Sequence, residues 1–420
     1  MKITGIIAEY NPFHNGHLYH LNLARKTTNA DYIVVVMSGD YVQRGTPALL
    51  DKYTRAEMAL KAGADLVLEL PCLFSCSSAE FFAEGAVGIL HDLGSISSIC
   101  FGSETAMQDK FDHIAEQFLS ETETFKQHLH TLLATGISYP KARSEAFLAS
   151  LPKSERPIYE SILQTPNNIL GIEYTKALKR RKSSILPVPI TRIHTGYHDT
   201  SLPEQGFCSA TAIRTMILEQ LQTDSSSPLL EQLCNQMPPS AFLLLSQKYK
   251  EKRLLFENNF SSLLQYKLLE VDNYSEYADW NEELANRIRS FSSPNQTFSE
   301  LVSSLKSRQY TQTRIQRALL HLLLDIKNKD LLLSKQYEFH SYAKVLGFKK
   351  SSAPLLKQLR ITSSIPIIQQ LAKGEMLLTP YANSLFQLDK KAHKLYQMLL
   401  CQAYSLPYEE ELSIKPLILP

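Results

Sequence analysis

The stretch of sequence that decides the fold lies at the amino terminus, where residues 3–17 read Ile3-Thr4-Gly5-Ile6-Ile7-Ala8-Glu9-Tyr10-Asn11-Pro12-Phe13-His14-Asn15-Gly16-His17. Residues 3–8 are a short apolar run typical of a buried strand, and residues 16–26 carry leucines at helical spacing. A loop with two histidines therefore joins a predicted strand to a predicted helix. In an open parallel sheet, ligands bind beyond the carboxyl ends of the strands, and a helix N-terminus presents free N–H groups to a phosphate. The junction is thus a candidate phosphate-binding site.

The same alternation of strand and helix continues through the first half of the chain. Apolar, β-branched runs predict strands at residues 32–37, 65–70, 98–101 and 186–193, and helical spacing predicts helices at 55–62, 79–90 and 211–222. Such units form right-handed crossovers, so we expect a doubly wound parallel sheet over residues 1–222. Residues 224–228 are typical of a linker, and residues 229–420 show helical periodicity with almost no credible strand. The predicted fold class is α/β, followed by an all-helical domain.

Composition excludes several classes of protein. Hydrophobic residues make up 44% of the 420 residues and charged residues 20%, which rules out a disordered chain. The net charge is only +2, so any nucleic-acid surface must be a local patch. No window of about 18 apolar residues is present for a membrane span, and the amino terminus lacks the long apolar stretch of a signal peptide. We expect a cytoplasmic protein.

The loop spells His-x-Gly-His at the first strand–helix junction, and this is similar to the signature of the nucleotidylyl-transferase superfamily, which shares the HUP fold. Longer blocks resemble the tRNA(Met) cytidine acetate ligase family. They are GIIAEYNPFHNGHLYHL at 5–21, MSGDYVQRGTPALLDKYTRAEMAL at 37–60, GADLVLELP at 63–71, CFGSE at 100–104, NNILGIEY at 167–174 and SATAIR at 209–214. The resemblance spans the predicted α/β domain and continues more weakly through the helical half.

The resemblance implies a tRNA-modifying ligase. Such an enzyme uses ATP to convert acetate into acetyl-adenylate, and passes the acetyl group to the wobble cytidine of elongator tRNA(Met) to give N4-acetylcytidine. Mg²⁺ can accompany ATP, but the sequence identifies no protein ligand for it. Carried over residue by residue, the resemblance assigns ATP contacts to Ile7, Ala8, Glu9, Tyr10, Asn11, Pro12, Phe13, His14, Asn15, Gly16, His17, Leu18, Tyr19, His20, Gly102, Asn168, Arg192 and Ile193.

These residue types suit the chemistry that the resemblance implies. Attack on the α-phosphorus builds negative charge on phosphate oxygens, and His14 and His17 are candidate catalytic donors to that charge. Arg192 is a permanently charged group that suits departing pyrophosphate. Gly16 removes a side chain where a nucleotide would approach the backbone. Without its context, the loop would read as a strand–helix turn with solvated histidines.

Two further groups of residues admit two interpretations each. Ser209, Thr211 and Arg214 resemble the second superfamily signature and start a predicted helix, so they either hold phosphates or form an ordinary N-cap with a surface arginine. Asp40 and Arg44 follow the second strand at the same sheet edge. Asp40 either accepts the proton that the cytidine amine loses or caps the loop, and Arg44 either binds acetate or a phosphate or is the ion-pair partner of Asp40.

Three stretches are rich in lysine and arginine and lack acids. They lie within residues 174–192, 306–317 and 339–373. Each is either a solvated helix face or part of a surface that binds RNA phosphates. Because two of the three lie beyond residue 229, we expect the helical half to bind the tRNA.

Two other functions stay open on the residues alone. One is a small-metabolite adenylyl- or cytidylyltransferase, for which a helical half of this length is unusual. The other is an RNA-binding protein without catalysis, against which the intact His14, Gly16 and His17 argue.

Overall fold

The computed structural model describes residues 1–192, 207–223, 229–291, 293 and 295–420. Its centre is one twisted sheet with the strand order β10-β8-β5-β2-β1-β6-β7, with β9 paired to β8. Strands β1, β2, β5, β6 and β7 run parallel, as predicted for the first half of the chain. Their bounds are Ile3–Ala8, Tyr32–Ser38, Leu66–Leu70, Ser98–Ser103 and Leu186–Thr191.

Alternate residues of the central strands bury opposite faces of this sheet, because successive side chains of a strand point in opposite directions. On β2, Val34 and Val36 belong to one apolar cluster, whereas Ile33, Val35 and Met37 belong to the other. The second face is covered by α1 (Asn15–Thr28), α2 (Lys52–Lys61), α10 (Ala210–Thr223) and α12 (Pro239–Lys250). The first face is covered mainly by α4 (Ala79–Asp92), α5 (Gln108–Ser120) and α9 (Pro166–Arg180). The predicted doubly wound sheet is therefore confirmed.

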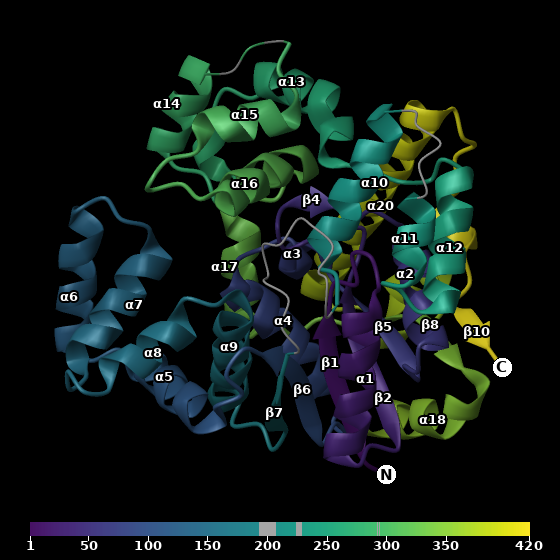
Figure 1. Cartoon of the computed structure of the whole chain (residues 1–420), viewed down its shortest axis with the longest axis horizontal. Helices are drawn as coiled ribbons and strands as arrows, with labels where there is room; N and C mark the ends of the chain where they lie inside the picture. Colours follow the sequence, from purple (N-terminus) through teal and green to yellow (C-terminus); the bar gives the residue numbers. More distant parts are fainter. Residues whose placement is uncertain (193–206, 224–228, 292, 294) are drawn as a thin grey trace.

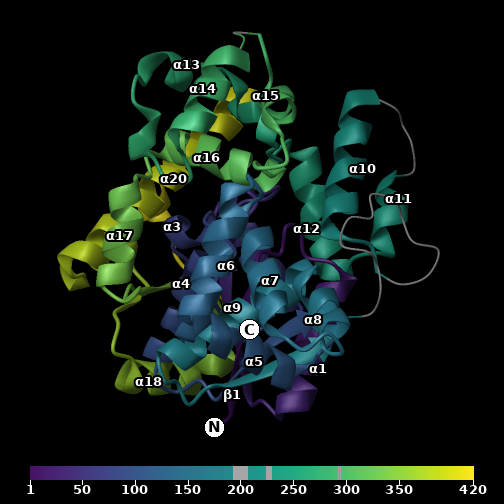
Figure 2. The same cartoon turned by 90° about the vertical axis from the view of Figure 1, so that its left-hand side faces the viewer.

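Two groups of further helices extend away from the sheet (Figure 1). One lies beside α5 and consists of α6 (Glu123–Ala134), α7 (Tyr139–Ser150) and α8 (Arg156–Leu163). The other consists of α13 (Ser261–Glu270), α14 (Glu282–Phe291), α15 (Phe298–Leu305) and α16 (Gln312–Leu324), and α17 (Asn328–Gln336) leads from it back toward the sheet. Figure 2 shows the second group at the end of the molecule opposite the amino terminus. A short α11 (Leu229–Cys234) precedes α12. Residues 229–420 are thus mainly helical, as predicted.

The C-terminal half departs from that prediction at three strands, because it also completes the sheet. β8 (Ala343–Lys349) pairs antiparallel with β5, and β9 (Ile367–Ile368) and β10 (Leu417–Leu419) pair with β8. Helices α18 (Ala353–Thr362), α19 (Leu371–Gly374) and α20 (Pro380–Tyr404) belong to the same part of the chain, with α19 packed against β9 and α20 packed against α3. β9 and β10 are too short to show a period, and β8 lies in a lysine-rich run, so local pattern did not reveal them. The predicted linker at 224–228 lies outside the described residues.

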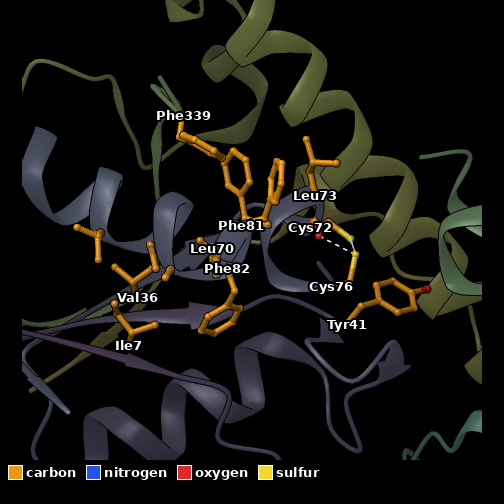
Figure 3. Close-up of a cluster of buried hydrophobic side chains, with 14 of the residues drawn as sticks. Ile7, Val36, Tyr41, Leu70, Cys72, Leu73, Cys76, Phe81, Phe82 and Phe339 are labelled. Atoms are coloured by element: carbon orange, nitrogen blue, oxygen red, sulfur yellow. Dashed lines mark hydrogen bonds between the residues drawn. The ribbon is translucent and has the colours of Figure 1, made fainter. Parts of the chain in front are cut away.

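A single apolar cluster contains side chains from both halves of the chain. Figure 3 shows Ile7 and Val36 of the sheet to the left of Phe82, and Phe339 of the C-terminal half beside Phe81. The ring centroids of Phe81 and Phe339 are 5.4 Å apart. The helix α3 (Cys72–Ser75) is buried in the same cluster. Because the two halves share this core, we expect neither to fold independently.

The two halves also meet in a buried group of charged side chains, the ionic cluster, made of Asp40, Lys52, Glu69, Lys344, His393 and Glu411. The Lys52 ammonium lies 2.9 Å from Glu69 Oε1, 2.5 Å from Glu411 Oε1 and 3.4 Å from Asp40 Oδ2. Lys344 contacts the carboxylates of Glu69 and Glu411 at 2.7 and 2.6 Å. All six side chains are buried. Carboxylates from both halves of the chain thus share two lysines.

Candidate active site

A cleft opens at the carboxyl ends of β1 and β6, where the fold places the N-terminal residues of three helices. The loop after β1 and the start of α1 form one wall, Asn167 at the start of α9 forms another, and residues 207–211 at the start of α10 form a third. The N–H groups of the first helical turn have no partners within the helix, so each such end favours a bound anion. Several first-turn N–H groups already have partners elsewhere in the protein, since the Asn15 N–H donates to the Gln236 carbonyl and the Asn168 N–H donates to Glu104 Oε2. The dipoles of these helix ends still make the cleft favourable to a phosphate.

His14 and His17 occupy the centre of this wall and are held by the backbone of their own turn. His14 caps α1: the Gly16 N–H donates to His14 Nδ1 at 3.0 Å, and the His14 N–H donates to His17 Nδ1 at 3.2 Å. The two rings are stacked, with centroids 3.8 Å apart. Because each Nδ1 is an acceptor, the hydrogen-bond pattern assigns the proton of each neutral ring to Nε2. Both side chains thus offer one N–H donor to the cleft.

The histidines of this loop are kept uncharged. Burial, followed by the nearby charges of Arg192 and Arg214, lowers the pKa of His14 to about 3. Burial is also the main cause that lowers the pKa of His17 well below its usual value, and it lowers that of His20 to about 4, with Arg192 contributing in both cases. At neutral pH all three imidazoles are therefore neutral, and the positive charge in the cleft belongs to arginines.

The structure adds a second reason for Gly16 to the one predicted. A β-carbon at this position would lie 2.9 Å from His14 Cε1 and 3.1 Å from His14 Nδ1. Any larger residue would therefore push the His14 ring away from the Gly16 N–H. The glycine makes room for the histidine ring as well as for an approaching ligand.

Arg192 and Gly102 lie side by side at the ends of the paired strands β7 and β6, and both line the cleft. A β-carbon on Gly102 would lie 3.1 Å from Arg192 Cγ, so the glycine lets the arginine chain pass. Arg192 Nη1 donates to Asn167 Oδ1 at 3.2 Å, and Asn167 Nδ2 donates to Glu104 Oε1 at 2.6 Å. The predicted residue Asn168 is fully buried behind this wall, where its Oδ1 accepts from Ser103 Oγ and the Glu104 N–H. Asn167 is thus the side chain that lines the cleft.

The second signature borders the same cleft. Ser209, Thr211 and Arg214 line the cleft at the start of α10. Ser209 Oγ accepts from the Ala212 N–H at 3.0 Å, so it also caps the helix. Arg214 Nη1 donates to the Asn11 carbonyl at 2.6 Å and ties α10 to the histidine loop. The capping and ligand-binding interpretations are therefore compatible.

The structure separates Asp40 from Arg44. Arg44 lines the cleft from the hairpin of β3 (Tyr41–Val42) and β4 (Thr46–Pro47). Asp40 is 4% exposed, is not among the lining residues, and lies in the ionic cluster, where its Oδ2 is 2.7 Å from His393 Nδ1. Although burial raises its pKa, Lys52 and His393 hold that pKa well below the usual range. These contacts favour the structural interpretation of Asp40, with Lys52 and His393 as its partners.

The other predicted loop residues divide by position. Those that line the cleft are Ile7, Ala8, Glu9, Tyr10, Asn11, Tyr19 and His20. Pro12, Phe13, Asn15 and Leu18 are not among the lining residues, and Phe13 belongs to the apolar core under α1. Ile193 lies outside the described residues.

Sequence reasoning missed Arg55, which holds the loop in place. This fully buried guanidinium donates to the carbonyls of Glu9 at 2.7 Å and Ser38 at 3.1 Å, and also to those of Leu50 and Gly39. Four carbonyls from three segments thus share one side chain, which fixes the position of the loop after β1. The position of Arg55 on a predicted helix gave no signal, because its partners are backbone carbonyls, which the sequence does not distinguish, and three of the four lie 16 to 46 residues away.

Within the described part of the chain, no group of three or more His, Cys, Asp or Glu side chains could hold a metal ion. Among the same residues, no helix is long and apolar enough to cross a membrane.

Comparison with known proteins identifies the family of the chain. Residues 1–410 match the family model described as HIGH Nucleotidyl Transferase. The tRNA(Met) cytidine acetate ligase of Clostridium novyi is 40% identical over 100% of both chains, and that of Acetivibrio thermocellus is 39% identical over 95% of both. The crystal structure of Thermotoga maritima TmcAL bound with alpha-thio ATP superposes with a TM-score of 0.90 at 29% identity, covering 100% of both chains. The chain therefore belongs to the tRNA(Met) cytidine acetate ligase family of HIGH nucleotidyl transferases.

Proposed function

We propose that this protein activates acetate with ATP and transfers the acetyl group to the wobble cytidine of elongator tRNA(Met), giving N4-acetylcytidine. Its relatives carry the ligase name over the whole length of the chain, and the similar Thermotoga protein binds alpha-thio ATP. The observation that carries the proposal is the pair of neutral imidazoles, His14 and His17, each with Nδ1 occupied by a backbone N–H, in a cleft that also holds Arg192 and Arg214.

In the first step, a carboxylate oxygen of acetate attacks the α-phosphorus of ATP. A new P–O bond forms, the bond to the β-phosphate oxygen breaks, and pyrophosphate leaves. His14 and His17 donate from Nε2 to the phosphate oxygens that gain charge, and they do so without first losing a proton. Such preorganised donors lower the barrier because they need no reorganisation during the reaction. The arginines stabilise the departing pyrophosphate.

In the second step, the exocyclic amine of the cytidine attacks the acetyl carbonyl of acetyl-adenylate. The new C–N bond replaces the C–O bond to the phosphate, AMP leaves, and the amine loses one proton. The donors that bound the triphosphate then face the AMP phosphate. We assign no base to this proton, because Asp40 is buried and ion-paired.

We further propose that residues 1–222 supply the ATP site and that residues 229–420 supply most of the tRNA contact. The two parts would have different roles but belong to one folded unit, because β8 and the ionic cluster join the two halves of the chain. A fragment that ends near residue 222 would lose β8, which pairs with β5. It would also lose Glu411, which pairs with Lys52, and His393, which pairs with Asp40.

The direct test uses labelled acetate, ATP and pyrophosphate, first without RNA and then with tRNA. We expect acetate-dependent exchange of pyrophosphate into ATP without RNA, and label on elongator tRNA(Met) but not on a transcript with uridine at the wobble position. Exchange that ignores acetate and responds to a different small metabolite would contradict the proposal and favour a metabolite nucleotidylyltransferase.

A further inference from the structure

Four cations of the first basic stretch are paired with acids by the fold, whereas Lys182 is exposed and Arg192 lines the cleft. On α9, Lys176 pairs with Glu80 and Glu173, and Lys179 pairs with Asp112 and Glu116. The guanidinium groups of Arg180 and Arg181 both pair with the buried Glu84. The acids come from α4 and α5 as well as from α9 itself, so the local sequence did not reveal them. These four cations connect α9 to α4 and α5 and already have carboxylate partners, so they make a weaker case for RNA phosphates than unpaired cations do.

In the third stretch, residues 339–373, one lysine lies in the core, three cations lie on a remote surface, and Lys373 is exposed on α19. Lys344 is buried in the ionic cluster. Lys350, Lys357 and Arg360 are exposed near α18, but the neighbouring Lys349 N–H donates to the carbonyl of Asp65, just before β5 begins. This is the amino-terminal edge of the parallel strands, whereas the cleft lies at their carboxyl ends. Figures 1 and 2 show α18 at the end of the molecule where the chain begins.

The middle stretch, residues 306–317, lies toward the carboxyl ends of the parallel strands, as the cleft does (Figure 1). The β3–β4 hairpin, whose Arg44 lines the cleft, packs directly on α16: a β-carbon on Gly45 would lie 2.4 Å from the backbone nitrogen of Arg317. In Figure 1, β4 lies between α16 and α10. The hairpin therefore links the mouth of the cleft to the first turns of α16.

Three cations gather where α15 ends and α16 begins. Lys306 and Arg308 are exposed in the connecting turn. The guanidinium of Arg314 lies 4.9 Å from the ring centroid of the buried Tyr310, a cation–π contact that orients it on the first turn of α16. Of the nearby acids, Asp279 pairs with Arg317 at 3.0 Å, whereas Glu283 accepts from the neutral Tyr310 Oη and keeps its charge, so the three cations face one carboxylate that no cation neutralises. The patch therefore keeps a local excess of positive charge, to which the N-terminus of the 13-residue α16 adds.

We propose that Lys306, Arg308 and Arg314 bind phosphates of the RNA strand that leads away from the modified nucleotide, and that the β3–β4 hairpin guides this strand from the patch into the cleft. The proposal rests on the proposed function, since it needs a tRNA nucleotide in the cleft. It assigns RNA binding to one of the three basic stretches, whereas the sequence alone does not show which of them binds RNA. Phosphate contacts of this kind position an RNA without reading its sequence.

The test compares two triple variants of the full-length protein by salt titration of tRNA binding. One carries Lys306→Gln, Arg308→Gln and Arg314→Gln. The matched control carries Lys349→Gln, Lys350→Gln and Arg360→Gln, which removes the same charge from the opposite edge of the sheet. Each lost phosphate contact should flatten the slope of log K against log salt by about 0.7–0.9. We expect the first triple to lose about two to three units of slope and on the order of tenfold to a hundredfold in affinity near 0.15 M salt, and the control to match the parent.

Equal slopes for the parent and the first triple would overturn the proposal, as would equal flattening by both triples. Should the first triple unfold at a lower temperature than the parent, the single variant Arg308→Gln decides, because this exposed side chain lies in a turn. It should flatten the slope by about one contact, and an unchanged slope would again overturn the proposal. Acetate-dependent pyrophosphate exchange by the parent needs no RNA, so failure of the proposed function would appear there and not in these titrations.

Discussion

The cleft and the ionic cluster are both built from titratable side chains withdrawn from water, yet they handle charge in opposite ways. In the ionic cluster, Lys52 and Lys344 stand against the carboxylates of Asp40, Glu69 and Glu411. Although burial opposes ionisation, those carboxylates raise the pKa of Lys52 well above its usual value. In the cleft, arginine charges add to burial and drive the pKa of His14 down to about 3. One region balances charge against charge, and the other keeps neutral donors beside permanent cations.

This difference separates a structural role from a functional one. A buried charge is tolerated only with a partner, so every member of the ionic cluster is committed to another member. The neutral Nε2–H groups of His14 and His17 instead face a cleft, where a ligand supplies the acceptor. Removing a member should therefore affect stability in the ionic cluster and activity in the cleft.

The largest effect is expected from Lys52→Met, which leaves three buried carboxylates with one lysine fewer. Breaking a buried ion pair from one side costs about 3–5 kcal/mol. Urea unfolding of the parent and the variant measures this loss. The control is Lys61→Met, which removes a half-exposed pair with Glu57 on the same helix and should cost no more than about 0.5 kcal/mol. A Lys52→Met protein that is as stable as the parent but binds ATP more weakly would contradict the structural role of the ionic cluster.

The next effect is expected from His17→Ala, which removes a donor to the transition state. The barrier to acetyl-adenylate formation should rise by about 2.7–4 kcal/mol, a loss of about 100- to 1000-fold in rate. The rate of acetate-dependent pyrophosphate exchange measures it, below the unfolding temperature because the ring also accepts the His14 N–H. His128→Ala, on the exposed face of α6, should retain the parent rate. A rate within about threefold of the parent would remove His17 from the catalytic residues.

A pH experiment on His14 tests the neutral state of the imidazoles. The pKa of His14 is about 3 in the folded protein and about 6.5 in the unfolded chain, so the unfolded chain binds the extra proton between these values. The stability that neutral His14 contributes to the folded protein is fully present above pH 6.5, and it falls by about 1.4 kcal/mol for each pH unit below that value.

The variant His14→Asn retains a good helix cap but cannot titrate. Between pH 6.5 and 5, the parent should lose about 2 kcal/mol more stability than this variant. Asp389, whose pKa is raised to about 7 mainly by burial, has the opposite pH dependence, but it is common to both proteins and cancels. Parallel stability curves from urea unfolding would show that His14 titrates normally.

The smallest effect is expected from Asn167→Ala, which removes the acceptor that orients Arg192. Loss of one such hydrogen bond costs about 0.5–1.5 kcal/mol, so the KM for ATP should rise by about 2- to 13-fold with little change in stability. Asn168→Ala should instead lower stability, because it leaves Ser103 Oγ and the Glu104 N–H without their buried acceptor. Thermal unfolding and ATP kinetics, measured for both variants, distinguish them. A stability loss in Asn167→Ala together with a raised KM for ATP in Asn168→Ala would show that the roles of the two asparagines are exchanged.

Several features were predictable from sequence because they depend on local pattern and on the rules of parallel sheets. The period of the apolar residues located β1, α1, β2 and β6 to within a few residues. Parallel strands bring their carboxyl ends to one edge, so the His-x-Gly-His loop, Gly102 and the start of α10 had to meet there. That meeting is the cleft.

Only the tertiary structure decided which side chains face that cleft and which charges are already paired. Asn167 and Asn168 are neighbours, but a helix turns about 100° per residue, so only one can line the cleft. The lysines and arginines at 176–181 look free in sequence, yet they pair with acids that include Glu80, Glu84 and Asp112, about 65–100 residues away. Lys344 and β8 look like part of a basic surface and are buried in the sheet. The physical reason is that sequence pattern reports whether a side chain tends to be buried, whereas its partner is set by the packing of elements distant in the chain.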